Sequence, residues 1–124
     1  MIRLLIADDE KLEREALADM VSRRFEHEVV LELAENGRKA ADTAVLWGAD
    51  LILMDMKMPN LDGIDATRII RELAPDIPII ALTAYAYEHD KQAALKAGCN
   101  DFLTKPFTQE VLKETIKKWL DDKG

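Results

Sequence analysis

Residues 50–55 read DLILMD, four consecutive apolar side chains between two aspartates. A short apolar run without alternation is typical of a β-strand that is covered on both faces, as in a parallel sheet. LLIA at residues 4–7 and IPIIAL at residues 77–82 have the same character, and two more runs are rich in branched residues. We therefore expect five strands, at residues 3–7, 29–34, 50–54, 77–82 and 100–103.

The segments between these strands repeat apolar residues at helical spacing, and we interpret each repeat as a face packed on the sheet. The repeats are Leu12, Ala16, Leu17, Met20 and Val21; Ala40, Ala41, Ala44 and Val45; Ile64, Thr67, Ile70 and Leu73; Ala93, Ala94 and Ala97, with Gly98 as a helix C-cap; and Leu112, Ile116, Trp119 and Leu120. Parallel strands need right-handed crossovers with helices on both faces. Five strand–helix units therefore predict an α/β fold with a doubly wound (βα)₅ parallel sheet.

Length and charge limit the classes of protein to which the chain can belong. Its 124 residues suit a single domain over residues 1–124, with a core at about residues 3–120. A net charge of −7 argues against nucleic acid or an anionic membrane as the main partner. Cys99 is the only cysteine, which excludes an internal disulfide and suits a reducing compartment. The sequence has no signal-peptide core or membrane-length apolar run, so we expect a cytoplasmic protein without membrane insertion.

Polar residues stand at the ends of four expected strands, where open parallel sheets bind their ligands. They are Asp8-Asp9-Glu10, Asp55, Thr83-Ala84 and Thr104-Lys105-Pro106. Taken singly, Asp8 or Asp9 could cap the following helix, and Lys105-Pro106 could be an ordinary turn. Taken together, the carboxylates would repel one another unless a cation neutralised them. Oxygen ligands of this kind fit a hard dication, above all Mg²⁺.

A carboxylate beside Mg²⁺ can attack phosphorus to form an aspartyl phosphate, while a lysine and a hydroxyl contact the phosphoryl oxygens. Other phosphate chemistries fit less well. An FMN-binding flavodoxin would need a Ser/Thr/Gly loop where this chain has acidic DDE. A phosphatase of the haloacid dehalogenase type would need an aspartate in place of Lys57, and the P-loop motif GxxxxGK[ST] is absent from the sequence.

Four segments resemble the receiver domain of response regulators: LLIADDE, DLILMDMKMPNLDGIDATRIIR, PIIALTA and AGCNDFLTKPF. The resemblance covers about residues 3–120 and implies a flavodoxin-like five-stranded parallel sheet with strand order 2-1-3-4-5. Residues 50–107 look most like receivers attached to hybrid histidine kinases. The opening IADDEKLEREAL looks more like receivers of stand-alone response regulators.

The resemblance also implies roles for individual residues, carried over motif by motif. Asp55 would accept the phosphoryl group. Asp9, Asp55 and the Lys57 backbone carbonyl would bind Mg²⁺, and Asp8 would act through water. Thr83 and Lys105 would contact the phosphoryl oxygens, for which the small Ala84 leaves room; Thr83 and Phe102 would move on activation, and Lys105-Pro106 would form a cis peptide bond. The long side chains of Lys57 and Tyr85 would flank the path of the hydrolytic water, so we expect them to lengthen the phosphorylated lifetime.

These roles imply a receiver of a two-component system or phosphorelay, not a conventional enzyme, that promotes its own Mg²⁺-dependent phosphorylation and dephosphorylation. We expect the donor to be a histidine kinase or histidine phosphotransfer protein that docks beside residues 12–25, where Glu13, Arg14 and Arg24 are candidate contacts. We also expect a monomer or weak dimer, no direct nucleic-acid binding, and no output domain after Leu120. The alternative is a pseudo-receiver that acts only through protein contacts and is not phosphorylated.

Overall fold

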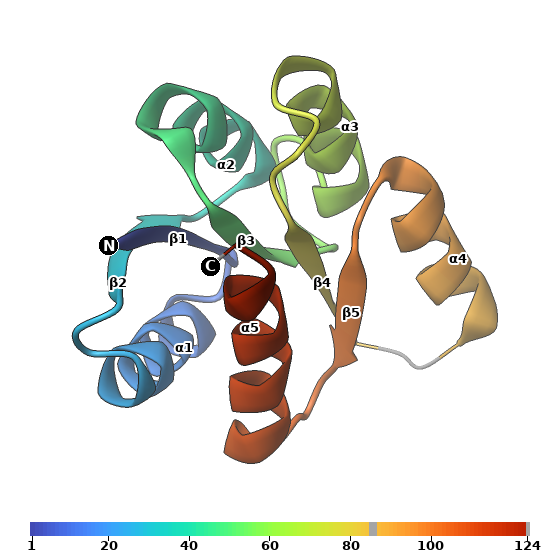
Figure 1. Cartoon of the computed structure of the whole chain (residues 1–124). Coiled ribbons are helices and arrows are strands. Elements are labelled where there is room, and N and C mark those ends of the chain that lie inside the picture. The colour runs from blue at the N-terminus through green and yellow to red at the C-terminus, as the bar shows by residue number, and fades with distance from the viewer. Residues whose placement is uncertain (85–86, 124) are drawn as a thin grey trace.

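The computed structural model describes residues 1–84 and 87–123, which form an alternating series of strands and helices. The elements are β1 (Ile2–Ala7), α1 (Lys11–Arg24), β2 (Val29–Ala34), α2 (Gly37–Thr43), a π-helical turn η1 (Ala44–Gly48), β3 (Leu51–Asp55), α3 (Gly63–Leu73), β4 (Ile79–Thr83), α4 (Glu88–Ala97), β5 (Asp101–Thr104) and α5 (Gln109–Lys123) (Figure 1). No helix in this part of the chain has the length and apolar character needed to cross a membrane.

All five strands are parallel, in the order β2-β1-β3-β4-β5. This confirms the doubly wound α/β fold and the strand order that the sequence predicts. Each predicted strand is present, with ends that differ by at most two residues. The strands β3, β4 and β5 each end one residue later than predicted, and their last residues are Asp55, Thr83 and Thr104.

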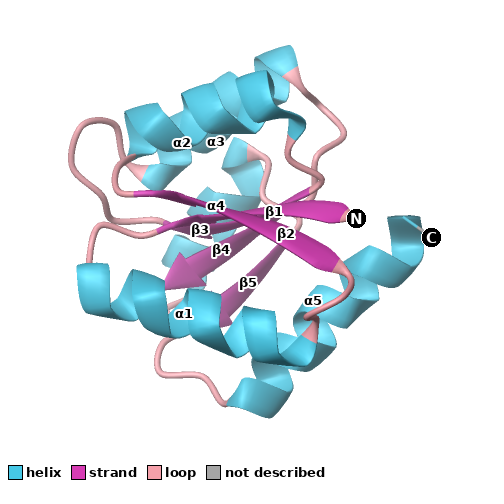
Figure 2. Cartoon of the chain, turned by 90° about the vertical axis from the view of Figure 1, so that its left-hand side faces the viewer, coloured by secondary structure: helices cyan, strands magenta, loops and turns pink. Residues whose placement is uncertain are grey.

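The helices cover the sheet on both faces and divide the core in two (Figures 1 and 2). On one face, α1 and α5 pack through Leu17, Val21, Leu112 and Ile116 onto alternate strand residues. On the other face, α2, α3 and α4 pack through small residues and Ile70. Because β1, β3 and β4 lie inside the sheet, their side chains are buried on both sides, as the unbroken apolar runs predict.

Local signals in the sequence begin and end several helices. The Asn36 side chain accepts a hydrogen bond from the Lys39 N–H at the start of α2, and Asp62 caps α3 through the Asp65 N–H in the same way. Gly98 ends α4 with a left-handed backbone (φ 119°), which confirms its prediction as a C-cap. The two N-caps determine where the loops at the carboxyl edge of the sheet end, whereas Gly98 begins the loop that leads to β5 at the opposite edge.

Four residues that the helical repeats placed in the core are exposed. Leu12 is 82% exposed and Leu73 is 64% exposed, and Ala16 and Ala93 are also exposed. In α1 the buried residues are Leu17 and Val21, and Leu12 lies about 140° around the helix from Leu17 at 100° per residue. The repeat in α1 therefore combines a buried face with an apolar surface that faces solvent.

Candidate metal centre at the carboxyl edge of the sheet

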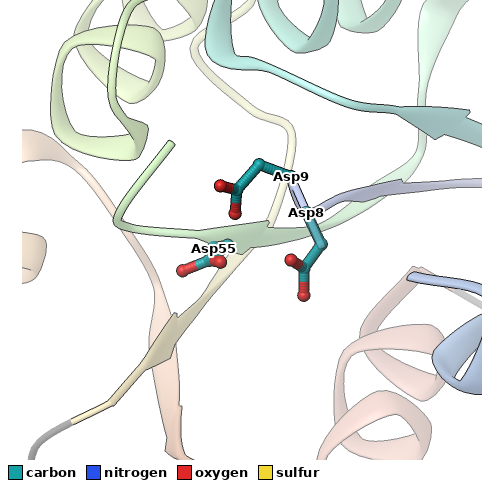
Figure 3. A group of neighbouring side chains, drawn as sticks. All are labelled: Asp8, Asp9 and Asp55. Carbon is teal, nitrogen blue, oxygen red and sulfur yellow. The ribbon is translucent and has the colours of Figure 1, made fainter. Parts of the chain in front are cut away.

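Three carboxylates from neighbouring strands meet at this edge. Asp8 and Asp9 directly follow β1, and Asp55 is the last residue of the adjacent β3. Each offers an oxygen atom, and these oxygens all lie within 4.8 Å of one another (Figure 3). Asp8 is fully buried and Asp55 is 8% exposed, whereas Asp9 is exposed. The acidic group is therefore buried at Asp8 and Asp55 and open to solvent at Asp9.

Backbone contacts orient the two buried carboxylates. The Glu10 N–H donates to Oδ1 of Asp8 at 3.0 Å, and the Lys57 N–H donates to Oδ1 of Asp55 at 3.1 Å. The Arg14 guanidinium donates to the Asp8 backbone carbonyl at 2.8 Å, which ties α1 to the end of β1. One oxygen of each carboxylate is thus held by the chain, and the second faces the Lys105 ammonium.

The Lys105 ammonium forms ion pairs with this group. Its Nζ lies 3.1 Å from Oδ2 of Asp8 and 3.5 Å from Oδ2 of Asp55, and its shortest contact, 2.7 Å, is to Oε2 of Glu13 in α1. Burial by itself would lower the pKa of Lys105, but Glu13, Asp55 and Asp8 outweigh it and raise that pKa above its usual value. Lys105 is therefore a permanent cation shared among three carboxylates.

One lysine does not fully compensate the acidic group. The pKa of the Asp55 carboxyl stands at about 6, against an ordinary 3.8, chiefly because burial disfavours its charged form. The Lys57 N–H and the Lys105 ammonium lower this pKa in part, and the Asp8 carboxylate raises it. A dication among the three aspartates would supply the missing positive charge, and oxygen ligands suit Mg²⁺. The donor set thus fits the metal that the sequence predicts.

Most of the predicted site residues line one cleft. Asp9, Asp55, Lys57, Thr83, Ala84 and Lys105 all line an opening of about 500 Å³. Thr83 is buried, and its hydroxyl donates to the Leu103 carbonyl at 3.4 Å. The Lys105–Pro106 peptide bond is cis, which confirms that expectation. Tyr85, which we expect to shield the site from water, lies outside the described residues.

Phe102 lies on the far side of β4 from Asp55 in the strand order, and not in the cleft lining. Its ring is partly buried against the core on the α2–α3–α4 face. The Lys91 ammonium of α4 lies 4.9 Å from the ring centroid, within the range of a cation–π contact. The structure therefore links the predicted switch aromatic to α4 rather than directly to the acidic group.

The loop after β3 carries the Lys57 carbonyl and adopts an unusual backbone. Asn60 and Leu61 have positive φ values of 50° and 84°, which are uncommon for residues other than glycine. The Arg38 N–H donates to the Asn60 carbonyl at 3.0 Å, and a side-chain carbon at Gly37 would collide with the Leu61 carbonyl oxygen. The start of α2 therefore holds this loop in place through close backbone contact.

The sequence motifs do not place Glu13 or Gly37 at the metal and phosphoryl site, and Glu13 was expected only as a contact of the donor protein. Glu13 follows Asp9 by four residues, so helical spacing alone could have placed it one turn above the site. Its contact with Lys105 depends on how close the fold brings the first turn of α1 to the loop after β5, which spacing does not give. Gly37 carries no sequence signal of a contact with a loop more than twenty residues away.

Comparison with known proteins places the chain among signalling domains. The family model for the response regulator receiver domain matches residues 4–117. Response regulator MprA of Mycolicibacterium vanbaalenii is 37% identical over 119 residues, which is 96% of this chain and 50% of that protein. The MprA protein of Mycobacterium bovis is 36% identical over the same length. The chain thus spans about half the length of the curated relatives it matches.

Two solved receiver domains are similar over almost the whole chain. The receiver of the sensor histidine kinase PA1611 from Pseudomonas aeruginosa has a magnesium ion coordinated in its active site cleft; it is 34% identical, with a TM-score of 0.87, over 97% of this chain and 98% of that one. The receiver of Saccharomyces cerevisiae Ssk1, solved with the histidine phosphotransfer protein Ypd1, is 33% identical with a TM-score of 0.87, over 95% and 88% of the two chains.

Proposed function

The chain belongs to the response regulator receiver domain family, and from that premise we propose that it accepts a phosphoryl group on Asp55 in a Mg²⁺-dependent reaction. The observation that carries the proposal is the meeting of three carboxylates and Lys105 at one edge of the sheet. Receivers are not conventional enzymes, and this chain would promote its own phosphorylation and dephosphorylation without converting a separate substrate.

The metal roles follow from position and exposure. Asp9 is exposed at the cleft and would bind Mg²⁺ directly, together with Asp55 and the Lys57 backbone carbonyl. Asp8 is fully buried and already holds Lys105, so it would act through a water molecule. When bound, Mg²⁺ offsets negative charge on the phosphoryl oxygens. The magnesium ion in the similar PA1611 receiver supports this assignment.

The transfer itself uses the carboxylate of Asp55 as the nucleophile. A bond forms between its oxygen and phosphorus while the bond from phosphorus to the donor histidine nitrogen breaks, and that nitrogen keeps the electron pair and takes a proton from solvent. Lys105 is already within 3.5 Å of Asp55 and would pair with a phosphoryl oxygen. The small side chain of Ala84 at the cleft leaves space for that group.

A phosphoryl group would change more than the cleft, because it replaces the single charge of the Asp55 carboxylate with close to two negative charges on oxygens beside Thr83. The Thr83 hydroxyl donates a long hydrogen bond, 3.4 Å, to the Leu103 carbonyl, and would exchange it for a phosphoryl oxygen. Phe102 would then turn inward and lose its contact with Lys91. In this way phosphorylation of Asp55 would alter the surface of α4, β5 and α5.

The donor would be a histidine kinase or a histidine phosphotransfer protein that docks along α1. An apolar groove beside the cleft fits a helical partner; it is lined by Ala16, Leu17, Met20, Pro106 and Phe107. Leu12, 82% exposed, adds apolar surface to α1 outside the lining of this groove. The complex of the similar Ssk1 receiver with Ypd1 supports this class of partner. We also propose that the receiver chain is located in the cytoplasm and that it is a monomer or a weak dimer.

A pseudo-receiver that acts only through protein contacts is not favoured. Such a protein gains nothing from a buried carboxylate whose pKa is raised by burial and which is faced by a lysine, since burying charge is costly. The acidic group and Lys105 are instead the parts that phosphorylation requires.

Incubation with acetyl phosphate and Mg²⁺, followed by intact-mass measurement, tests the proposed function. We expect one added phosphoryl group on the wild-type chain, none without Mg²⁺, and none on Asp55→Asn. Asp42→Asn is the matched control, because Asp42 is exposed in α2 away from the cleft, and it should be labelled like the wild type. Equal labelling of the Asp55→Asn variant would show that the acceptor is another residue.

A further inference from the structure

Glu13 makes the shortest contact of the Lys105 ammonium. Nζ lies 2.7 Å from Oε2 of Glu13, 3.1 Å from Asp8 and 3.5 Å from Asp55. Glu13 is in the first turn of α1, a different element from both aspartates. The lysine that would serve the phosphoryl group is therefore held most closely by a residue outside the acceptor and its metal ligands.

The surroundings of the pair show that this contact can be released. The Lys105 side chain is 22% exposed, whereas that of Glu13 is 51% exposed and can leave for solvent without burying a charge. Asp8 is fully buried and cannot move in this way. Of the three carboxylates around Lys105, Glu13 is thus the one that can withdraw.

We propose that Glu13 is a positioning residue that holds Lys105 in a resting place and competes with the incoming phosphoryl oxygens for it. This inference rests on the proposed function, since it concerns the same lysine and the same acceptor. Lys105 must form a new ion pair with the phosphoryl group, and the pair with Glu13 is one that it must give up or share. The resting contact therefore lowers the affinity of the site for a phosphoryl group.

The position of Glu13 also places this contact where a donor would arrive. Glu13 lines the cleft that contains Asp55, and it also lines the apolar groove along α1. A partner that docks in that groove would meet the Glu13 side chain next to Lys105. Release of Lys105 would then accompany docking, so the acceptor site would be ready when the donor is in place.

The test measures the affinity of the chain for beryllofluoride, a phosphoryl mimic, at saturating Mg²⁺. We expect Glu13→Gln to bind it about twofold to fivefold more tightly than the wild type, the range for a partly exposed ion pair. Glu10→Gln is the matched control. Glu10 lines the same cleft, but within residues 1–84 and 87–123 its carboxylate forms no ion pair with Lys105. The Glu10→Gln substitution removes the same charge as Glu13→Gln, and we expect it to change the affinity for beryllofluoride by less than about 1.5-fold, which is smaller than the effect of an ion pair.

A second titration, with Mg²⁺ alone, separates positioning from a general change in the electrostatic field. Freed from Glu13, Lys105 can move onto Asp8 and Asp55, so Glu13→Gln should not raise the affinity for Mg²⁺ alone. The inference is overturned if Glu13→Gln binds beryllofluoride no more tightly than Glu10→Gln, or if its affinity for Mg²⁺ rises in parallel. If the wild-type chain binds no beryllofluoride, the proposed function itself is wrong.

Discussion

Asp55 combines two properties that do not usually occur together: it is buried at the end of a central strand, and it must carry charge to act as the nucleophile that we propose. Burial raises its pKa to about 6, and Lys105 recovers only part of the loss. The charged form therefore depends on neighbouring cations. Mg²⁺ at the site would both create the nucleophile and stabilise the fold, which links metal binding to folding stability.

The raised pKa of Asp55 predicts a pH-dependent difference between the wild type and Asp55→Asn in the absence of metal. Because the folded-state pKa lies above the unfolded value of 3.8, neutral Asp55 favours the fold below about pH 4, and this contribution is lost as the pH rises through about 6. We therefore compare the unfolding free energy of Asp55→Asn with that of the wild type in EDTA at two pH values. The advantage of the variant should be larger at pH 7 than at pH 4 by on the order of 2 kcal/mol.

Urea denaturation between pH 4 and pH 7 measures this difference. Asp42→Asn, at an exposed position, should show no such trend, and added Mg²⁺ should shrink the difference for Asp55→Asn because it stabilises the charged wild type. A difference that stays constant with pH, or grows toward low pH, would mean that Asp55 is charged at little cost in the metal-free fold.

At the residue scale, the sequence was sufficient wherever position along a strand decides the outcome. Asp8, Asp9, Asp55, Thr83 and Lys105 could be predicted to meet because the carboxyl ends of parallel strands share one edge of the sheet. The contact of Glu13 with Lys105 could not be predicted, because it joins the first turn of α1 to the loop after β5, two segments far apart in the sequence. Proximity across elements is a property of the packed fold and not of spacing.

At the scale of elements, the loop after β3 depends on its neighbour α2. Asn60 and Leu61 have left-handed backbone conformations that cost energy, and the contacts of Gly37 and the Arg38 N–H hold them there. This loop carries the Lys57 carbonyl that we propose as a metal ligand. The start of α2 thus contributes to the site although none of its side chains lines the cleft.

Gly37→Ala should therefore destabilise both the fold and the proposed metal site. Its methyl group would meet the Leu61 carbonyl oxygen, and backbone must move to make room. We expect a loss of about 1–3 kcal/mol in unfolding free energy, as for other overpacked sites, together with weaker Mg²⁺ binding. Denaturant titration with and without Mg²⁺ measures both effects.

Arg38→Ala is the control for this change, because the Arg38 side chain is exposed and the variant keeps the N–H that binds Asn60. It should change the unfolding free energy by less than about 0.5 kcal/mol. If Gly37→Ala were as stable as this control, the close approach of α2 to the loop would have no energetic importance.

The strands were predictable as elements because apolar runs buried on both faces have no helical alternative of that length. The buried faces of the helices were less predictable. Leu12 continues the apolar repeat of α1 but lies off its buried face, and Leu73 is followed by Ala74, which packs against the core in its place. The π-helical turn η1 had no sequence signal, since its residues fit an α-helix equally well.

At the scale of the whole molecule, the cleft and the groove along α1 form a continuous surface, joined by Glu13 and Lys105. Two residues that the sequence offered for testing this surface are unsuitable. Glu13 contacts Lys105, and Arg14 holds the Asp8 carbonyl, so substitutions there would disturb the site itself. Arg24, the third, is paired with Glu110 of α5.

Ala16→Glu tests docking without touching the site. Ala16 is exposed and lines the apolar groove, so a charged side chain there should block a helical donor. We expect transfer from a phosphohistidine protein to slow at least tenfold, while labelling by acetyl phosphate stays normal. Asp19→Ala, exposed on the same helix and outside the groove lining, is the control. A fall in both reactions, or in neither, would place the docking surface elsewhere.

The central claim is that Asp55 becomes an aspartyl phosphate, and reductive trapping tests it most directly. After the chain is incubated with acetyl phosphate and Mg²⁺, borohydride reduces the acyl phosphate and converts the phosphorylated aspartate to homoserine, which peptide mass mapping locates. We expect homoserine at position 55, dependent on Mg²⁺, with Asp8 and Asp9 unchanged. Homoserine at position 8 or 9, or at no position in a chain shown to be folded, would contradict it.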